Sequence, residues 1–368
     1  LLRRLAEVEG EGEVRRLHGR AGAWLAEHGQ VDEAIPHALA SGEPDMAADL
    51  VERHVEPALA DRRWMAIERW LGLLPPEQVH GRPALLLAQA WVQRLRGQDV
   101  AFGLTLDRVD ALLVEPAGAS DPVAIGRWRA EATFMRRTFL APYDLEAGAT
   151  LDAATRAAET IPWETHAAAS TALVYVGAAR QMIGDEIGAI RVLTRALAEC
   201  AGRSDPFALH RAECASLGLI GVWLNAGDLE RCRVTASELL DLTTVHGLGW
   251  GAVMARAYLG TVAYEQNRLD AAIGHFAAAA EEAEASSLIL SRVYLGLALA
   301  HEMAGHRSEA DATVNRYLDR LIATDGTTAI PAVRSFQARL AFKRGKIATA
   351  LCWLNKSRVA GPAGSAHA

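Results

Sequence analysis

The chain has 368 residues, of which 51% are hydrophobic and 23% are charged, and its formal net charge is −7. This length is enough for two or three compact domains or for one long array of repeats. The negative charge argues against a general attraction to nucleic acids or anionic membranes, although it leaves room for a local basic patch. No run of about 18 uncharged apolar residues occurs, so no membrane span is predicted.

The chain begins with Leu1 and the run LLRR, which is neither a signal peptide nor a Met start. We therefore expect an excised piece of a longer protein. The cysteines lie in Ala- and Leu-rich stretches and form no C-x-x-C pair; they are Cys200, Cys214, Cys232 and Cys352. This pattern predicts reduced thiols in helix cores and a cytoplasmic protein, rather than a disulfide framework.

The hydrophobic pattern is helical along nearly the whole chain. Apolar residues recur at spacings of three and four, and no segment alternates with a period of two. In chain order, Gly29, Gly42 and Gly97 are candidate turns, residues 116–122 are a predicted loop, and Pro142 is a further candidate turn. The Gly-, Pro- and Ser-containing end, residues 361–368, is predicted to be a flexible tail.

A short cassette recurs along the chain: a turn residue is followed five positions later by a small residue. It is found at Gly29/Ala34, Gly184/Ala189, Gly227/Cys232, Asn267/Ala272, Gly305/Ala310 and Gly345/Ala350. The last five turns are 38 to 43 residues apart, a period typical of stacked helix pairs. The small residues allow two helix backbones to approach, and a larger residue fills the gap to the next pair.

These residues resemble the tetratricopeptide repeat, in which small residues lie seven before and five and twelve after the turn. Gly177, Gly184, Ala189 and Ala196 match every position, and Gly260, Asn267, Ala272 and Ala279 match closely. The pairs at Gly227 and Gly305 depart at Ile220, Cys232, Leu239 and Tyr317, and the period exceeds the usual 34 residues. The resemblance implies an all-α fold, a superhelical α-solenoid of antiparallel helix pairs.

A second resemblance covers residues 17–91. It is carried by the runs WLAEHGQVDEAIPHALA (24–40), GEPDMAADL (42–50), WLGLLP (70–75) and RPALLLAQAW (82–91). These runs look like the central region of the large ATP-binding LuxR-family transcription regulators, typified by the activator of the maltose regulon. In that family a nucleotide-binding module precedes a helical-repeat sensor, and a helix-turn-helix domain comes after it.

The resemblance implies a sensor module within a signal-transducing regulator. Residues 1–60 would link to the nucleotide-binding module, residues 61–358 would form the superhelix, and residues 359–368 would be a tail. The chain has no G-x-x-x-x-G-K-[ST] loop and no recognisable DNA-reading helix pair, so ATP is expected only in the preceding module and no direct nucleic-acid binding is expected. The expected partners are a small-molecule inducer or a regulatory protein, the other modules of the parent chain, and a second copy if the module self-associates.

No motif for catalysis or metal binding is complete. The chain lacks G-x-S-x-G, and Gly247-Leu248-Gly249 does not follow a strand. His301 and His306 are one residue too far apart for a helical zinc pair and flank a turn glycine. We therefore expect a protein that is not an enzyme and holds no metal.

The tetratricopeptide register predicts the ligand-binding residues. In such arrays the positions two and three before each turn commonly face the groove, and these positions hold Arg94, Phe139, Gln181, Asn225, Tyr264, Glu265, Glu302, Phe342 and Lys343, with Trp91 and Arg136 one helical turn further back. Aromatic planes with amides and charges suit a polar small molecule. Each position is also consistent with an ordinary half-exposed repeat residue.

Other features leave alternatives open. Arg127, Arg129, Arg136 and Arg137 form a basic segment that could bind an anionic ligand or an acidic partner, or could be a solvated face balanced by Glu131 and Asp144. Trp24, Trp70 and Trp353 lie on apolar faces and are predicted to be core residues. The main alternative to a sensor is a scaffold that binds a peptide or a partner's helix in the groove, without a small-molecule ligand.

Overall fold

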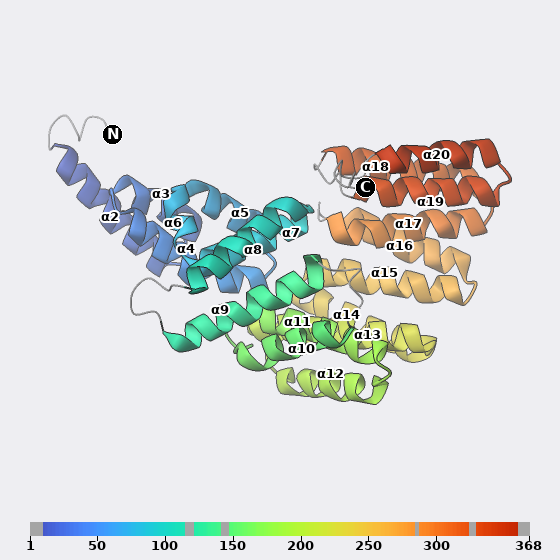
Figure 1. The fold of residues 1–368 in the computed structure, drawn as a ribbon, viewed down its shortest axis with the longest axis horizontal. Helices are drawn as coiled ribbons and strands as arrows, with labels where there is room; N and C mark the ends of the chain where they lie inside the picture. The colour runs from blue at the N-terminus through green and yellow to red at the C-terminus, as the bar shows by residue number, and fades with distance from the viewer. Residues whose placement is uncertain (1–9, 115–120, 141–146, 284–286, 324–328, 360–368) are drawn as a thin grey trace, which may run out of the picture. The chain divides into compact units, whose positions relative to one another are not determined.

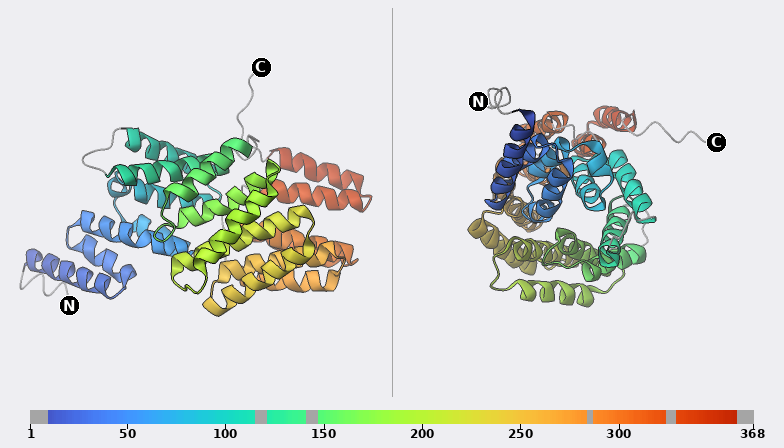
Figure 2. Two further views of the ribbon diagram at one scale, coloured as in Figure 1. Left: turned by 90° about the horizontal axis from the view of Figure 1, so that it is seen from below. Right: turned by 90° about the vertical axis from the view of Figure 1, so that its left-hand side faces the viewer.

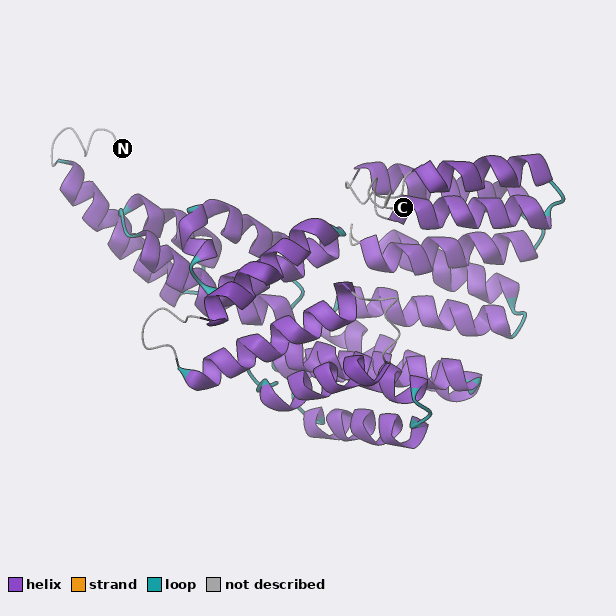
Figure 3. Ribbon diagram, viewed as in Figure 1, coloured by secondary structure: helices purple, strands orange, loops and turns teal. Residues whose placement is uncertain are grey.

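The computed structural model describes residues 10–114, 121–140, 147–283, 287–323 and 329–359. Within these ranges it contains helices, turns and no strand (Figures 1 and 3). The predicted all-α fold is therefore confirmed. No helix in the described ranges is both long enough and apolar enough to cross a membrane. The candidate turn at Pro142, most of the predicted loop at 116–122 and the tail at 361–368 lie outside these ranges.

The chain forms two compact units. The first consists of residues 1–94 and 99–218, and the second of residues 95–98 and 219–368. Each unit has its own apolar core, drawn from residues 31–176 in the first and from residues 253–340 in the second. The predicted boundary between residues 60 and 61 falls inside the first unit and stays a prediction.

The helices of the first unit follow one another with short connections. They are α2 (Glu11–Glu27), α3 (Val31–Ala40), α4 (Pro44–Ala60), α5 (Trp64–Leu73), α6 (Pro76–His80), α7 (Pro83–Arg96), α8 (Asp99–Val114), α9 (Pro122–Met135), the π-helix η1 (Arg136–Leu140), α10 (Ala147–Thr160), α11 (Ala167–Met182) and α12 (Glu186–Cys200). The next helix, α13 (Pro206–Ala226), runs through the boundary between the units.

The helices of the second unit form successive antiparallel pairs. They are α14 (Leu229–His246), α15 (Gly249–Glu265), α16 (Leu269–Glu282), α17 (Ser287–Met303), α18 (Arg307–Ala323), α19 (Ile330–Lys343) and α20 (Ile347–Val359). Helix α15 packs on α16, α17 on α18 and α19 on α20, and α16 also packs on α17 (Figures 1 and 2). From α14 to α20, successive helices therefore contact one another.

The predicted turn residues end their helices in the left-handed conformation. The backbone φ is between 57° and 86° at Gly29, Gly42, Gly97, Gly184, Gly227, Asn267, Gly305 and Gly345. At Asn267 its N–H donates to the Tyr264 carbonyl over 2.9 Å, and the Arg268 N–H donates to the Ala263 carbonyl over 2.8 Å. This is the Schellman arrangement, which satisfies carbonyls that a helix end leaves unpaired.

The residue five positions after each of these turns packs in the core. Those residues are Ala34, Ala47, Phe102, Ala189, Cys232, Ala272, Ala310 and Ala350, and each is at most 5% exposed. The structure adds one cassette that sequence reasoning missed: Arg62 has a φ of 56°, and Ile67, five residues later, is fully buried. Arginine does not indicate a turn in a sequence, so this cassette could not be recognised from its residue types.

Alanine in place of Asn267 is expected to lower the free energy of unfolding by about 1 kcal/mol, because a left-handed backbone is costly for a residue with a Cβ and no local polar group. Glycine at the same position should change it by less than about 0.5 kcal/mol. Urea denaturation followed by circular dichroism measures both. The neighbouring Gln266, with a φ of −84°, is the control, since its replacement by alanine should be nearly neutral. Equal losses for the Ala and Gly variants of Asn267 would contradict this explanation.

Large side chains between helix pairs are matched by glycines on both sides. A Cβ at Gly260 would lie 3.0 Å from the Phe276 ring, and a Cβ at Gly296 would lie 2.5 Å from its Cζ atom. Leu193 is enclosed in the same way between Gly177 and Gly218. Phe276 and Leu193 both come nine residues after their turns. The size rule inferred from sequence thus extends to a glycine on the first helix of the next pair.

Two side-chain predictions are corrected by the structure. Trp70 is buried, but Trp24 is 54% exposed, because it lies on the side of α2 away from the core and stacks on His28 with ring centroids 4.0 Å apart. Cys200, Cys214 and Cys232 are buried as predicted, whereas Cys352 is exposed on α20.

Candidate functional site

The eleven predicted groove residues lie near the carboxyl ends of helices in both units. The first unit holds Trp91 and Arg94 on α7, Arg136 and Phe139 on η1, and Gln181 on α11. The second unit holds Asn225 on α13, Tyr264 and Glu265 on α15, Glu302 on α17, and Phe342 and Lys343 on α19. Their assignment to ligand binding stays a prediction.

Trp91, Arg94 and Phe139 are brought together in the first unit. The ring centroids of Trp91 and Phe139 are 5.8 Å apart, and the Arg94 Cζ atom lies 4.9 Å from the Phe139 ring centroid. They belong to an aromatic cluster whose rings are Trp91, Phe102, Phe134, Phe139 and Tyr175. Phe139, Tyr175 and Arg94 are half-buried, whereas the other rings of the cluster are buried. The cluster therefore has a buried apolar part and a partly accessible part that carries the Arg94 charge.

The π-helix η1 explains how Phe139 reaches this cluster. In a π-helix the hydrogen bonds run from residue i to i+5, which brings residues five apart close to one face. Phe134 and Phe139 are five apart, and their ring centroids lie 5.9 Å from each other. A continuous α-helix would turn Phe139 well away from Phe134. The register from Pro142 predicted the importance of Phe139, but it could not predict the π turn that positions it.

Two carboxylates interact near the aromatic cluster, the buried Glu131, which contacts it, and the half-buried Glu56. The Trp91 indole Nε1 donates to Glu131 Oε1 over 2.7 Å, and the backbone N–H of Ala167 donates to Glu56 Oε2 over 3.1 Å. Burial raises the pKa of Glu131 to about 7, against the indole hydrogen bond and the charge of Arg127. Burial and the charge of Glu131 raise the pKa of Glu56 to about 8. These acids therefore hold protons in the folded chain that they release on unfolding.

A second cluster of buried polar side chains lies around His210 on α13. The His210 ring Nε2 lies 3.2 Å from the Ala167 carbonyl oxygen and 3.2 Å from Thr171 Oγ1. Glu213, also on α13, is 2.8 Å from an Arg62 guanidinium nitrogen, and both side chains are largely buried. The Arg62 turn is thereby tied to α13.

The other two predicted residues of the first unit lie apart from the aromatic cluster. Arg136 forms ion pairs with Asp107 and Asp110 of α8, at 3.0 Å and 2.8 Å. Gln181 is half-buried in the last turn of α11. Arg136 therefore connects η1 to α8 through ion pairs and is not part of the aromatic cluster.

In the second unit the predicted residues have mixed surroundings. Tyr264 is half-buried against the core, while Asn225, Glu265, Phe342 and Lys343 are exposed. Glu302 is engaged by Arg344, whose Nε donates to both carboxylate oxygens over 3.0 Å, and Arg344 also pairs with Asp311 over 2.9 Å. Glu302 therefore links α17 to the turn after α19.

Sequence reasoning did not predict that ionisable groups pack inside the first unit: Glu131, His210 and Glu213 are buried, and Glu56 and Arg62 are half-buried. Glu131, expected to balance the charge of a solvated arginine face, is instead 2% exposed, and its apolar neighbours Ala130, Ala132 and Phe134 were the one local signal of its burial. A carboxylate in such a stretch is seldom buried unless a donor reaches it. The donor is Trp91, forty residues away in the sequence, and no local pattern indicates that pairing.

The raised pKa values of Glu56 and Glu131 predict that stability falls as pH rises. Their contribution is complete below the ordinary carboxyl pKa of 4.5 and is lost towards pH 8. Glutamine at Glu131 keeps the acceptor for Trp91 and removes the titration, so the decline between pH 5 and pH 8 should be smaller by about 2 kcal/mol. Urea denaturation across that pH range measures the slope.

The control is Gln at Glu281, which is exposed on α16 and should leave the slope unchanged. His166, whose pKa burial lowers to about 4, has the opposite sign of pH dependence, and its effect is common to wild type and variant. Identical slopes for wild type and the Glu131→Gln chain would contradict the protonated state of the buried acids.

The chain was compared with protein families, curated proteins and solved structures. No family model matches it. The serine/threonine-protein kinase PknK of Mycobacterium tuberculosis is 36% identical over 112 residues, which are 30% of this chain and 10% of the kinase. PknK of Mycobacterium bovis matches to the same extent. The matched part is thus a small fraction of those proteins.

Solved structures match over nearly the whole chain. A signal transduction ATPase with numerous domains (STAND) from Pyrococcus horikoshii, which has a tetratricopeptide repeat sensor, superposes with a TM-score of 0.55 at 16% identity. The match covers 95% of this chain and 52% of that protein. Human IFIT1, in its dimer with PPP-AAAA, gives a TM-score of 0.53 at 15% identity, over 97% of this chain and 79% of IFIT1. The chain therefore has the tetratricopeptide-like α-solenoid fold predicted from its repeats.

Proposed function

We propose that this chain is the sensing module of a larger signal-transducing ATPase of the LuxR-family regulator type, in which it binds an inducer on the helix ends that hold the predicted groove residues. The observation that carries the proposal is the fold likeness, over 95% of this chain, to a STAND protein whose repeat domain is a sensor. The LuxR-like runs between residues 17 and 91 support the same class.

The aromatic cluster supports a small polar ligand in the first unit. Phe139 and Tyr175 offer partly accessible ring surface, and Arg94 adds a charge that can fix the orientation of a ligand. The mechanism would be ligand-biased switching. An inducer changes the state of the regulator only if it binds one state more tightly than the other. ATP would bind in the preceding module, and the chain itself would bind its ligand without turnover.

Thermal-shift screening of the 368-residue chain against a metabolite library tests this proposal, with calorimetric titration of each compound that raises Tm. The expected result is at least one binder whose affinity falls about tenfold or more when Phe139 is replaced by leucine and Arg94 by glutamine. Leucine at Met65, which is exposed on α5, is the matched control. The absence of any binder, or binding unaffected by both changes, would count against a small-molecule sensor of this kind.

A scaffold that binds a peptide is the second candidate. Phe342 is 68% exposed beside the exposed Lys343 on α19, a pairing of apolar and cationic groups that suits a peptide side chain and a carboxylate. A partner whose binding is abolished by Ala at Phe342, in a chain that responds to no metabolite, would favour the scaffold.

A further inference from the structure

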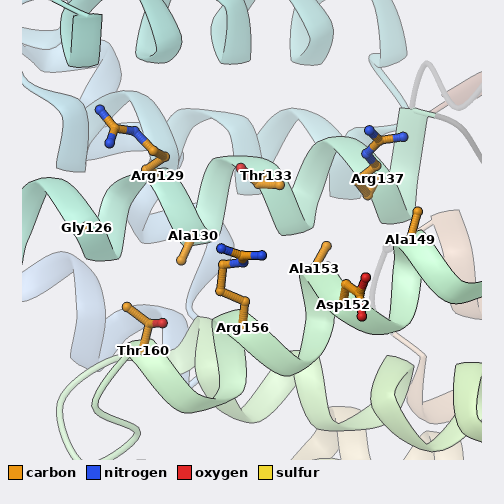
Figure 4. A pocket seen from close by; sticks show the side chains of 10 residues that line it. All are labelled: Gly126, Arg129, Ala130, Thr133, Arg137, Ala149, Asp152, Ala153, Arg156 and Thr160. Atoms are coloured by element: carbon orange, nitrogen blue, oxygen red, sulfur yellow. The ribbon is translucent and has the colours of Figure 1, made fainter.

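A groove between α9 and α10 in the first unit has features of a separate ligand site (Figure 4). Its volume is about 560 Å³, within the range of small-molecule sites. It is lined by Gly126, Arg129, Ala130, Thr133, Arg137, Ala149, Asp152, Ala153, Arg156 and Thr160. None of these is one of the predicted groove residues, so the site lies beyond the proposed inducer surface and does not depend on it.

The floor of the groove is made of small residues from both helices. Ala130 on α9 and Ala153 on α10 are buried where the helices pack, and both line the groove. At Gly126 a Cβ would find nothing within 4 Å, so the space beside α9 at this point is open. The small floor therefore leaves room for a ligand between the two helices.

The rim of the groove is basic and rich in hydroxyl groups. Arg129, Thr133 and Arg137 are spaced by four residues and follow one side of α9 and η1, while Arg156 and Thr160 come from α10. Figure 4 shows Arg156 rising from α10 into the space between the helices. Arg129 and Arg137 are eight residues apart, which separates their backbones by about 12 Å along the helix axis. In Figure 4 the Arg129 and Arg137 side chains leave α9 on the side away from α10, so the groove has Arg156 within it and the other two arginines along its α9 edge.

These arginines differ from their neighbours in how their charge is balanced. Arg136 pairs with Asp107 and Asp110, whereas no carboxylate of the described residues lies within 4 Å of Arg137 or Arg156. Arg129 is held in place because its Nη2 donates to the Leu113 carbonyl over 3.1 Å. Asp152 is the one acid among the lining residues. In a chain of net charge −7, the groove is thus a local excess of positive charge.

We propose that this groove binds a small polyanion, one that carries at least two phosphate or carboxylate groups. The planar guanidinium fork matches both kinds of anion with two parallel hydrogen bonds, and the threonine hydroxyls on each wall can donate to the remaining oxygens. A single anionic group could not reach arginines at both ends of the groove. A compact ligand with two or more such groups could contact Arg156 and the exposed Arg137 together.

Calorimetric titration of the whole chain with pyrophosphate and with citrate tests the proposal and separates phosphate from carboxylate ligands. Acetate serves as the monovalent comparison. At least one of the two polyanions should bind, more weakly as salt is raised, and acetate should not. The double variant Arg137→Ala/Arg156→Ala should bind the polyanion at least about tenfold more weakly, since each change removes a charge-assisted contact. Both residues are exposed, so Tm should change little.

Two further variants keep the outcome unambiguous. Leucine at Gly126 adds no charge but fills the open space, so it should also weaken binding about tenfold or more. The double variant Arg195→Ala/Arg233→Ala removes two surface arginines from α12 and α14 and should bind like wild type. Absence of binding at millimolar polyanion, or equal weakening by the α12/α14 variant, would overturn the site. Neither result would bear on the inducer screen, which depends on Phe139 and Arg94.

Discussion

Replacing Gly296 by alanine is expected to lower the free energy of unfolding of the second unit by about 2 kcal/mol, although alanine normally favours a helix over glycine by about 1 kcal/mol. The new Cβ would lie 2.5 Å and 2.6 Å from two atoms of the Phe276 ring. The ring has little room to retreat, because its other side packs against Gly260, where an added Cβ would lie only 3.0 Å from it. Either α17 must move away from α16, or Phe276 must leave its position.

Gly274 provides a matched control on α16. It is exposed, and a Cβ there would meet nothing within 4 Å, so alanine at Gly274 should stabilise the chain by about 0.5 to 1 kcal/mol. Leucine at Phe276, combined with alanine at Gly296, should recover part of the loss because the shorter side chain makes room. Urea denaturation followed by circular dichroism gives all three values. A stabilising effect of alanine at both glycines would show that Phe276 does not set the helix spacing.

Methionine in place of Arg62 is expected to cost about 3 kcal/mol, because it removes the nearer cation from the buried Glu213 carboxylate and leaves it, among the described residues, only the His210 ring, 3.8 Å away. The guanidinium lies 2.8 Å from Glu213, whose side chain is 3% exposed. The arginine charge also holds the pKa of Glu213 below its usual range, against the effect of burial. Stability measured at pH 7 should therefore fall more than loss of packing alone would cause.

The Arg233–Glu230 pair gives the comparison for this experiment. It has a similar distance of 2.6 Å but lies on the surface of α14, so methionine at Arg233 should cost less than about 1 kcal/mol. Adding glutamine at Glu213 to the Arg62→Met chain removes the buried charge and should restore about half of the loss. If the Arg62 and Arg233 variants lose the same amount, the buried pair has no special role.

The repeat explains why so much of the fold could be predicted from sequence. A left-handed turn residue and a small residue five positions later are both local requirements, and they recur at Gly184, Gly227, Asn267, Gly305 and Gly345. The Schellman turn and the close helix contact impose them at each pair, so a single chain displays the rule several times. The turn at Arg62 was not predicted, because arginine is not a turn-forming residue type. Its left-handed conformation accompanies a long-range ion pair with Glu213.

The candidate site was less predictable because long-range pairing decides which side chains are free. The tetratricopeptide register placed Glu302 and Arg136 at groove positions. In the structure Glu302 is bound by Arg344, and Arg136 is bound by acids of α8. Both partners are remote in the sequence and carry no local signal. Arg137 and Arg156 lie in separate helices, so their shared groove also becomes evident only once α9 packs on α10.

The two proposed sites use different parts of the helices. The inducer proposal uses helix ends, where each turn exposes the last residues of a helix, and there Arg94 and Phe139 already contact each other. The polyanion proposal uses the sides of α9 and η1 with α10. Since η1 carries Phe139 on one side and Arg137 on another, a ligand at either place contacts the same π-helix. Coupling between the two sites would require both ligands to favour one arrangement of that segment.

Amide hydrogen exchange of the 368-residue chain, with and without the metabolite that raises Tm most in the screen, tests the sensing proposal most directly. Binding at the predicted helix ends should slow exchange at the carboxyl-terminal turns of α7 and α11 and in η1, and the effect should disappear when Phe139 is leucine and Arg94 is glutamine. Unchanged exchange in these segments at saturating ligand, or protection that persists in that variant, would contradict the proposal.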